Sequence, residues 1–156
     1  MAKRRSVGAL RRLRPWLIGW GTFQVAVAVT GWLLAWRRNE GDATSTSIRR
    51  TLTHGGLELR PTNPRVTRVR VDLAMAGAAI DLTGLPRPES GIDVTARVLM
   101  GGLAVRVPAD WRVWWQMQGI GGMGGDGAVQ RERDEQGADV RVHAAVVLGG
   151  VGIEAV

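Results

Sequence analysis

Residues 92–108, which read IDVTARVLMGGLAVRVP, constrain the fold of this 156-residue chain most strongly. Apolar and polar residues alternate up to Val98, and the alternation resumes after Gly102. A period of two residues is typical of a strand with one buried face. Glycine lacks Cβ and tolerates unusual backbone angles, so the Gly101-Gly102 pair predicts a sharp bend or bulge between two strand segments.

The same unit occurs five times. The second small residue of each pair is Gly56, Gly77, Gly102, Gly122 and Gly150. These positions are 21, 25, 20 and 28 residues apart, so the period is loose. A recurring unit of this length is typical of stacked repeats, and it predicts an all-β repeat domain over residues 54–156.

Alignment of the units on these glycines predicts which side chains point inward. The first, third and fifth positions after the glycine are apolar in four of the five units. The fourth position is always charged and is expected to point outward. These residues are Arg60, Asp81, Arg106, Asp126 and Glu154. If the units stack in chain order, the charges alternate through the first four members, which is mildly favourable on a sheet face.

Three tryptophans, Trp111, Trp114 and Trp115, precede the fourth unit and have two interpretations. At least one of them caps the core, because tryptophan buries a large area. Alternatively, they form an exposed patch that binds a partner, a glycan or a lipid interface. Neighbours in a strand face opposite sides, so Trp114 and Trp115 cannot both point inward.

The N-terminal region predicts a membrane anchor. Residues 1–15 are a basic tail, and residues 16–36 are uncharged and long enough to cross a bilayer as a helix. The residues expected to anchor it at the two interfaces are Trp16, Trp20, Trp32 and Trp36. A buried soluble helix and a signal peptide cleaved near Ala28 are the alternatives.

The cation bias predicts the orientation of this span. Six cations precede it and four follow it, which favours a cytoplasmic N-terminus and an extracytoplasmic domain. Residues 37–53 are polar and small, and they predict a flexible tether. Residues 130–139 carry many charges and predict a solvated turn.

Charge and chemistry exclude several functions. Residues 1–50 carry ten Lys or Arg and two acids, whereas residues 51–156 carry eleven Arg and twelve acids. The repeat domain therefore offers no basic face for nucleic acid. A single calcium-type nonapeptide at residues 121–129 and a GxGxxG run at 119–124 lack the context that such sites need. We expect no catalytic residues, cofactor or metal, and no enzyme activity.

The bends MGGLAVRVP and LGGVGIEAV, with the phrase VPADWRV, resemble the C-terminal domain of LiaF-like proteins, the cell-wall-active-antibiotic response proteins, and the related putative-adhesin β-solenoids. The resemblance covers roughly residues 69–156. It implies a small right-handed β-helix and a membrane-associated regulator of an envelope-stress histidine kinase. Such regulators usually carry several spans, whereas this chain predicts one.

Two functions follow as expectations. The first is a regulator or sensor of a bacterial cell-envelope stress response, anchored in the lipid bilayer and acting by contact with a membrane histidine kinase or another envelope protein. The second is a structural or adhesin-like scaffold that assembles edge to edge, with residues 140–147 leaving an open edge for pairing.

Overall fold

A computed structural model describes residues 39–156 of the chain. The predicted basic tail and the predicted span, with its four tryptophans, lie outside the described residues. Within residues 39–156, no helix is long and apolar enough to cross a membrane.

The described residues form an all-β fold, as the alternation predicts. Its elements are β1 (Ser47–Leu59), β2 (Arg68–Asp81), β3 (Ile92–Val107), β4 (Arg112–Gly119), β5 (Gly122–Gly125), β6 (Gln130–Arg131), a 3₁₀ turn η1 (Glu135–Gly137) and β7 (Val140–Ala155). All pairs among the seven strands are parallel. Parallel pairing needs a connection that returns each strand to the same end, which the loops between strands provide.

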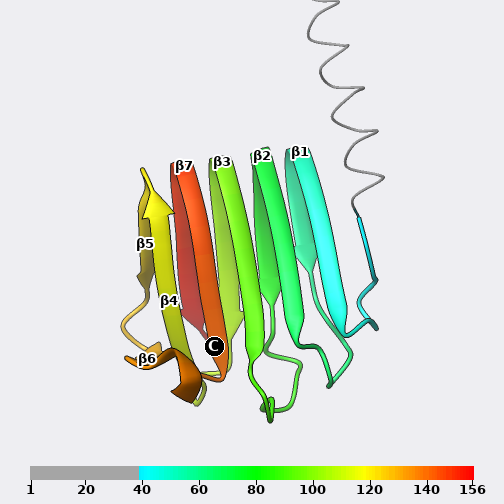
Figure 1. The fold of residues 1–156 in the computed structure, drawn as a ribbon, viewed down its shortest axis with the longest axis vertical. Helices are drawn as coiled ribbons and strands as arrows, with labels where there is room; N and C mark the ends of the chain where they lie inside the picture. The colour runs from blue at the N-terminus through cyan, green and yellow to red at the C-terminus, as the bar shows by residue number, and fades with distance from the viewer. Residues whose placement is uncertain (1–38) are drawn as a thin grey trace, which may run out of the picture. The chain divides into compact units, whose positions relative to one another are not determined.

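Each long strand bends once and contributes to two layers. Figure 1 shows β1, β2, β3 and β7 rising through one layer, turning over at the same end of the molecule and descending through a second. β4 and β5 form a fifth rung of this kind, interrupted between Gly119 and Gly122. The result is a two-layered parallel coil, consistent with a β-helix or solenoid.

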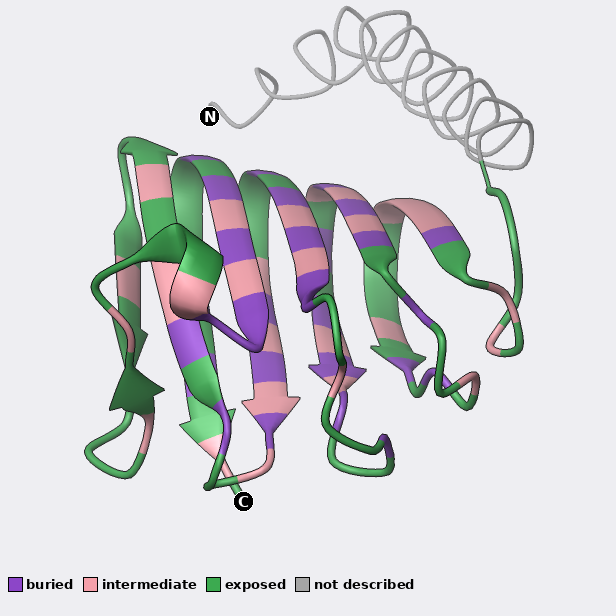
Figure 2. Ribbon diagram, turned by 60° about the horizontal axis from the view of Figure 1, so that its bottom comes forward, coloured by how far each residue is buried: buried purple, intermediate pink, exposed green. Residues whose placement is uncertain are grey.

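The predicted register of the repeats is confirmed. The aligned glycines lie in one row across the rungs, in the order Gly56, Gly77, Gly102, Gly150 and Gly122. In β3 the inward residues of both halves, such as Val94, Val98 and Val105, are almost fully buried, and their neighbours are not. Figure 2 shows this alternation as buried bands along each rung. The core therefore lies between the two layers.

The expectation that the units stack in chain order is wrong. The strand order is β1-β2-β3-β7-β4, and β5 also pairs with β7, so the last unit lies between the third and the fourth. β7 buries valines and Ile153 on both sides of its bend, which suits an interior rung. The inward residues of the β4–β5 rung are only partly buried, as expected of a rung at the end of the stack. They are Trp115, Met117 and Met123.

This order also corrects the predicted open edge. Residues 140–147 belong to β7, which is paired on one side with β3 and on the other with β4. Its backbone groups are therefore used within the domain. The ends of the described sheet are formed instead by β1, which Glu40 bridges at Arg49, and by the β4–β5 rung, whose β4 start pairs with β6.

The tether predicted at residues 37–53 is shorter than expected. β1 begins at Ser47, and Glu40 forms an antiparallel bridge with Arg49. The intervening turn is held by the Asp42 carboxylate, which accepts hydrogen bonds from the N–H and hydroxyl of Thr44 at 2.9 and 2.6 Å. Small polar residues here make local side chain–backbone bonds that order the turn, rather than a flexible coil.

Candidate functional site

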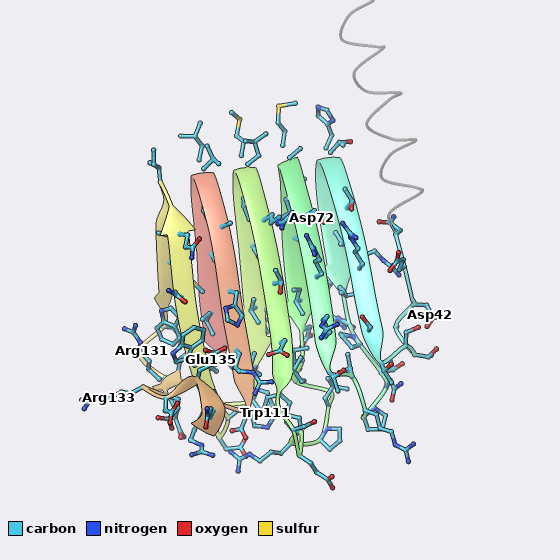
Figure 3. All side chains as sticks on the ribbon, in the orientation of Figure 1. Asp42, Asp72, Trp111, Arg131, Arg133 and Glu135 are labelled. Carbon is cyan, nitrogen blue, oxygen red and sulfur yellow. The ribbon has the colours of Figure 1, made fainter. Side chains whose placement is uncertain are left out.

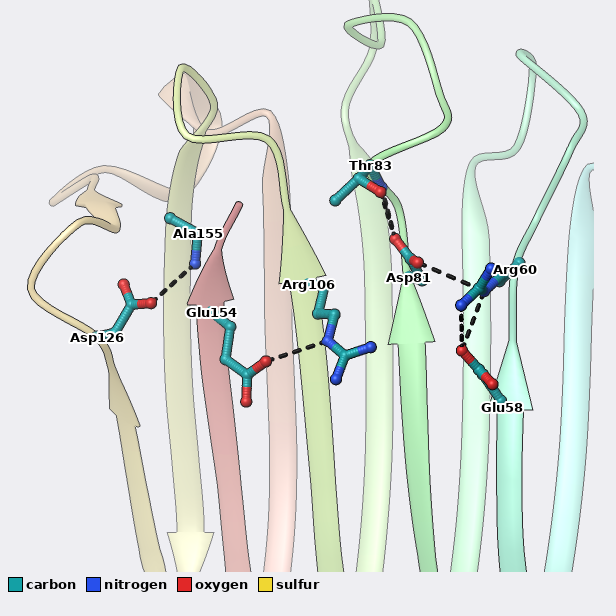
Figure 4. A network of polar contacts seen from close by, with 8 residues as sticks. All are labelled: Glu58, Arg60, Asp81, Thr83, Arg106, Asp126, Glu154 and Ala155. Atoms are coloured by element: carbon teal, nitrogen blue, oxygen red, sulfur yellow. Dashed lines mark hydrogen bonds and ion pairs between the residues drawn. The ribbon is translucent and has the colours of Figure 1, made fainter.

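The charged outward residues of the second layer form one row, which we call the charged row: Arg60, Asp81, Arg106, Glu154 and Asp126. Arg60 Nε lies 3.5 Å from Asp81 Oδ2, and Arg106 Nε lies 3.1 Å from Glu154 Oε2 (Figure 4). A hydrogen bond from the Thr83 hydroxyl is the main cause that holds the pKa of Asp81 below its ordinary value, and the two arginines add to it. These side chains point outward as predicted, and oppositely charged neighbours on adjacent rungs form ion pairs.

Asp126, the acid of the calcium-type nonapeptide, has a backbone role. Its carboxylate accepts hydrogen bonds from the N–H groups of Ala128, Val129 and Ala155, each at 3.1 Å. These contacts hold the turn after β5 against the end of β7. Within residues 39–156, no group of three His, Cys, Asp or Glu lies close enough together to hold a metal ion.

The predicted patch of Trp111, Trp114 and Trp115 is not one surface, because Trp111 lies in the core, whereas Trp114 and Trp115 border one surface hollow. Trp111 is 2% exposed and belongs to the core. Trp115 packs against the core from the end rung, with the Arg131 guanidinium 4.4 Å from its ring centroid. Trp114 faces outward, with its ring centroid 5.1 Å from that of His143.

A groove crosses the outer face of the first layer, close to the bend, and has a volume of about 590 Å³. We call it the outer groove. Its outward-facing lining residues come from all five rungs: Thr51, Thr53, Asp72, Ala74, Arg97, Leu99, Ala145, Val147 and Gln118. Alanines, Leu99 and Val147 make most of its surface apolar.

One end of the outer groove is polar. Asp72 stands on β2 (Figure 3). Its Oδ2 lies 3.3 Å from Nη2 of Arg49 on β1 and 3.5 Å from Nε of Arg70 on β2. Asp72 Oδ1, Thr51 Oγ1 and the Nε atoms of both arginines are buried without a hydrogen-bond partner among the described residues. The Arg49 and Asp72 side chains as wholes are 30% and 18% exposed, so this end of the groove presents an ion pair at the surface.

Sequence reasoning missed the outer groove. Its residues occupy outward positions before each bend, and they lie side by side only because the rungs stack in register. The signal that could have found it is the pair of small residues, Ala74 and Ala145, at outward positions otherwise filled by larger side chains.

Sequence reasoning also missed Asp139, which closes the predicted solvated stretch 130–139 but is buried. Its backbone N–H donates to the carbonyl of Arg112, and its own carbonyl accepts from the N–H of Ile92. Its carboxylate accepts from the N–H of Arg112 at 2.8 Å and lies 3.3 Å from Arg87 Nη2. Asp139 therefore ties the start of β7 to the starts of both neighbouring strands.

A scan against protein-family models and searches of curated proteins and of solved structures found no match to this chain. The resemblance to LiaF-like domains therefore stays a prediction. The two-layered parallel coil and the outer groove are the features from which a function can be argued.

Proposed function

We propose that the protein is a membrane-anchored, non-enzymatic regulator or sensor of a bacterial cell-envelope stress response that acts through protein–protein contact. The proposal includes one membrane span at residues 16–36, a cytoplasmic N-terminus, an extracytoplasmic domain and a right-handed coil of the LiaF-like kind. A membrane histidine kinase is the partner that the resemblance suggests.

The outer groove is the observation that carries this proposal. It crosses five rungs, which at a spacing of about 4.8 Å span roughly 19 Å. An apolar floor with the partly exposed Arg49–Asp72 pair at one end suits a segment of another protein that presents both apolar side chains and polar groups. Leu99 and Val147 lie in this groove, and both are about half exposed, so the apolar floor is accessible.

The short link to the predicted span supports the same function. The ordered turn leaves residues 37 and 38 between the predicted span and Asn39. Two residues reach at most about 7 Å. A domain held this close to the bilayer has a high effective concentration toward other membrane proteins, which favours a regulator of a neighbouring receptor over an enzyme that acts on diffusing substrates.

Filling the groove tests the proposal. Ala145→Trp in the full chain should change the transcriptional output of the envelope stress response under cell-wall antibiotics, as deletion of the protein does. Ala104→Trp is the matched control, because Ala104 faces outward from the second layer, away from the groove. Unchanged output in the deletion strain, or full complementation by the domain released from its span, would contradict the proposal.

Topology is tested by labelling. The chain has no cysteine, so single cysteines at Ser6 and Glu89 can be probed with a membrane-impermeant maleimide on intact cells. Glu89 is exposed in a loop of the described domain. Labelling at position 89 alone is expected, and labelling at position 6 alone would reverse the topology.

A scaffold that assembles end to end is the second candidate function. In the second layer, within the described residues, β5 pairs only with β7, and β1 pairs only with β2. If β1 of another copy paired with β5, Arg60 of that copy would lie beside Asp126 in the charged row. Concentration-dependent oligomers of the detergent-solubilised chain, abolished by Arg60→Glu, would favour this function, and a monomer at all concentrations would exclude it.

A further inference from the structure

Side chains stand along the outside of the bend, at the upper end of the rungs in Figure 3, and those of β2, β3 and β7 include large apolar residues. We define the bend ridge by its exposed residues: Met75, Leu99, Met100, Ile120, Val147 and Leu148. Each is 47–75% exposed. The only other large apolar side chain exposed among residues 39–156 is Val156 at the C-terminus. Nearly all the exposed apolar bulk of the described domain is therefore gathered at this end.

The ridge is continuous because the rungs are in register. Met75 pairs with Met100, and Met100 pairs with Leu148. Ile120 follows on the end rung, where its N–H donates to the carbonyl of Val146. Contiguous exposed apolar surface of this kind marks a contact with a protein or a membrane.

The opposite end of the domain differs in chemistry. The loops that join the rungs carry exposed charged residues, including Arg65, Arg87, Glu89 and Asp110. None of the six ridge positions carries a charge. A domain with one apolar end and one charged end has a defined orientation at an apolar–aqueous boundary.

The course of the chain identifies what the ridge contacts. Glu40 and Arg49 pair in an antiparallel sense, and the Asn39 side chain accepts a hydrogen bond from the N–H of Thr51 at 2.8 Å. From Glu40 back to Asn39, the chain therefore runs beside β1 in the direction of the bend of that strand, which lies near His54. In Figure 1 the described chain begins beside β1 and runs away from the bend toward the start of that strand.

We propose that the bend ridge is seated in the interfacial region of the lipid bilayer, with the rungs standing on the membrane. This inference rests on the proposed span, which would place the bilayer surface within two residues of Asn39, on the side from which the chain enters. The outer groove, which shares Leu99 and Val147 with the ridge, would then open beside the headgroups, within reach of a juxtamembrane segment of a partner.

The experiment uses the full chain reconstituted in phosphatidylcholine–phosphatidylglycerol vesicles. Leu148→Cys and Met100→Cys, each labelled with an environment-sensitive fluorophore, report on the ridge, and labelled Glu89→Cys is the control at the charged end. Two ridge positions guard against one variant that fails to fold. Lipids that carry spin labels at different depths should quench both ridge probes, with a depth about 5–10 Å below the headgroups, and should leave the control unquenched.

The remaining outcomes overturn the inference in distinguishable ways. Ridge probes that lipid spin labels do not quench, on a chain that resists alkaline extraction from the vesicles, would refute the ridge contact and leave the span standing. A chain that alkali extracts would refute the span and, with it, the inference. Ridge probes that are shielded from water but self-quench as the protein-to-lipid ratio rises would assign the ridge to a second copy.

Discussion

Arg106 on β3 pairs with Glu154 on β7, with 3.1 Å between Nε and Oε2, although Asp126 is closer to it in sequence. This pair exists because β7 returns between β3 and the β4–β5 rung. The charged row therefore runs Arg60, Asp81, Arg106, Glu154, Asp126, and its signs still alternate through four members. The order of the rungs thus becomes measurable through side-chain coupling.

A double-mutant cycle tests this order. Arg106→Ala and Glu154→Ala in the chain from Asn39 onward should couple by roughly 0.2–1 kcal/mol in the free energy of unfolding at low salt, and by less at high salt, because both side chains are partly exposed. The matched cycle of Arg106→Ala with Asp126→Ala should show no coupling. The reverse result in urea unfolding would indicate that the units stack in chain order.

Gly101 is expected to be the most sensitive of the paired glycines in β3. Its φ is +141°, and a Cβ there would overlap the carbonyl oxygen of Ala76. Gly101→Ala should lower the free energy of unfolding by about 2 kcal/mol or more. Gly102→Ala is the control, since its Cβ would meet Gly150 at an ordinary 3.8 Å. Equal stability of the two variants would mean that the bend is not built as described.

Asp139 should be the most costly acid to remove. Asp139→Ala leaves the part-buried N–H of Arg112 without its acceptor and the Arg87 guanidinium without this partner, and it is expected to cost about 2 kcal/mol. Asp110→Ala removes an exposed carboxylate and should cost less than about 0.5 kcal/mol. Denaturation midpoints of the two variants give the comparison, and a small effect at Asp139 would show that β7 is held in place by other contacts.

The tryptophans should separate into core and surface by their effect on stability. Trp111→Ala removes a fully buried ring and should cost about 3–5 kcal/mol. Trp114→Ala loses the contact with His143 on the outer face and should cost about 1 kcal/mol or less. Similar losses for both variants in urea unfolding would contradict the placement of Trp114 outside the core.

Asp81 is expected to contribute to the loss of folding stability at low pH. Its folded-state pKa is lowered, first by the Thr83 hydroxyl, so its stabilising contribution is full above the unfolded pKa of about 4 and is lost as the pH falls through the folded pKa. Asp81→Asn should therefore be less stable than the parent at pH 6, and the gap should close below about pH 4. Glu89→Gln is the exposed control, and a gap that widens in acid would contradict the prediction.

Local alternation determined most of the architecture from the sequence alone. The inward and outward faces of β3, the bends at the paired small residues, the register of the five glycines and the burial of one tryptophan all follow from period-two patterning and from the backbone freedom of glycine. These features depend on neighbours along the chain and on one repeated spacing, so the sequence contains them directly.

Tertiary structure alone decided the order of the rungs and everything that depends on it. Whether β7 or β4 lies beside β3 depends on how well each rung buries both of its faces, and on contacts such as those of Asp139, which join strand starts that are distant in sequence. The outer groove and the bend ridge likewise arise when side chains from five rungs come into one row. Their members share no local motif, because only stacking brings them together.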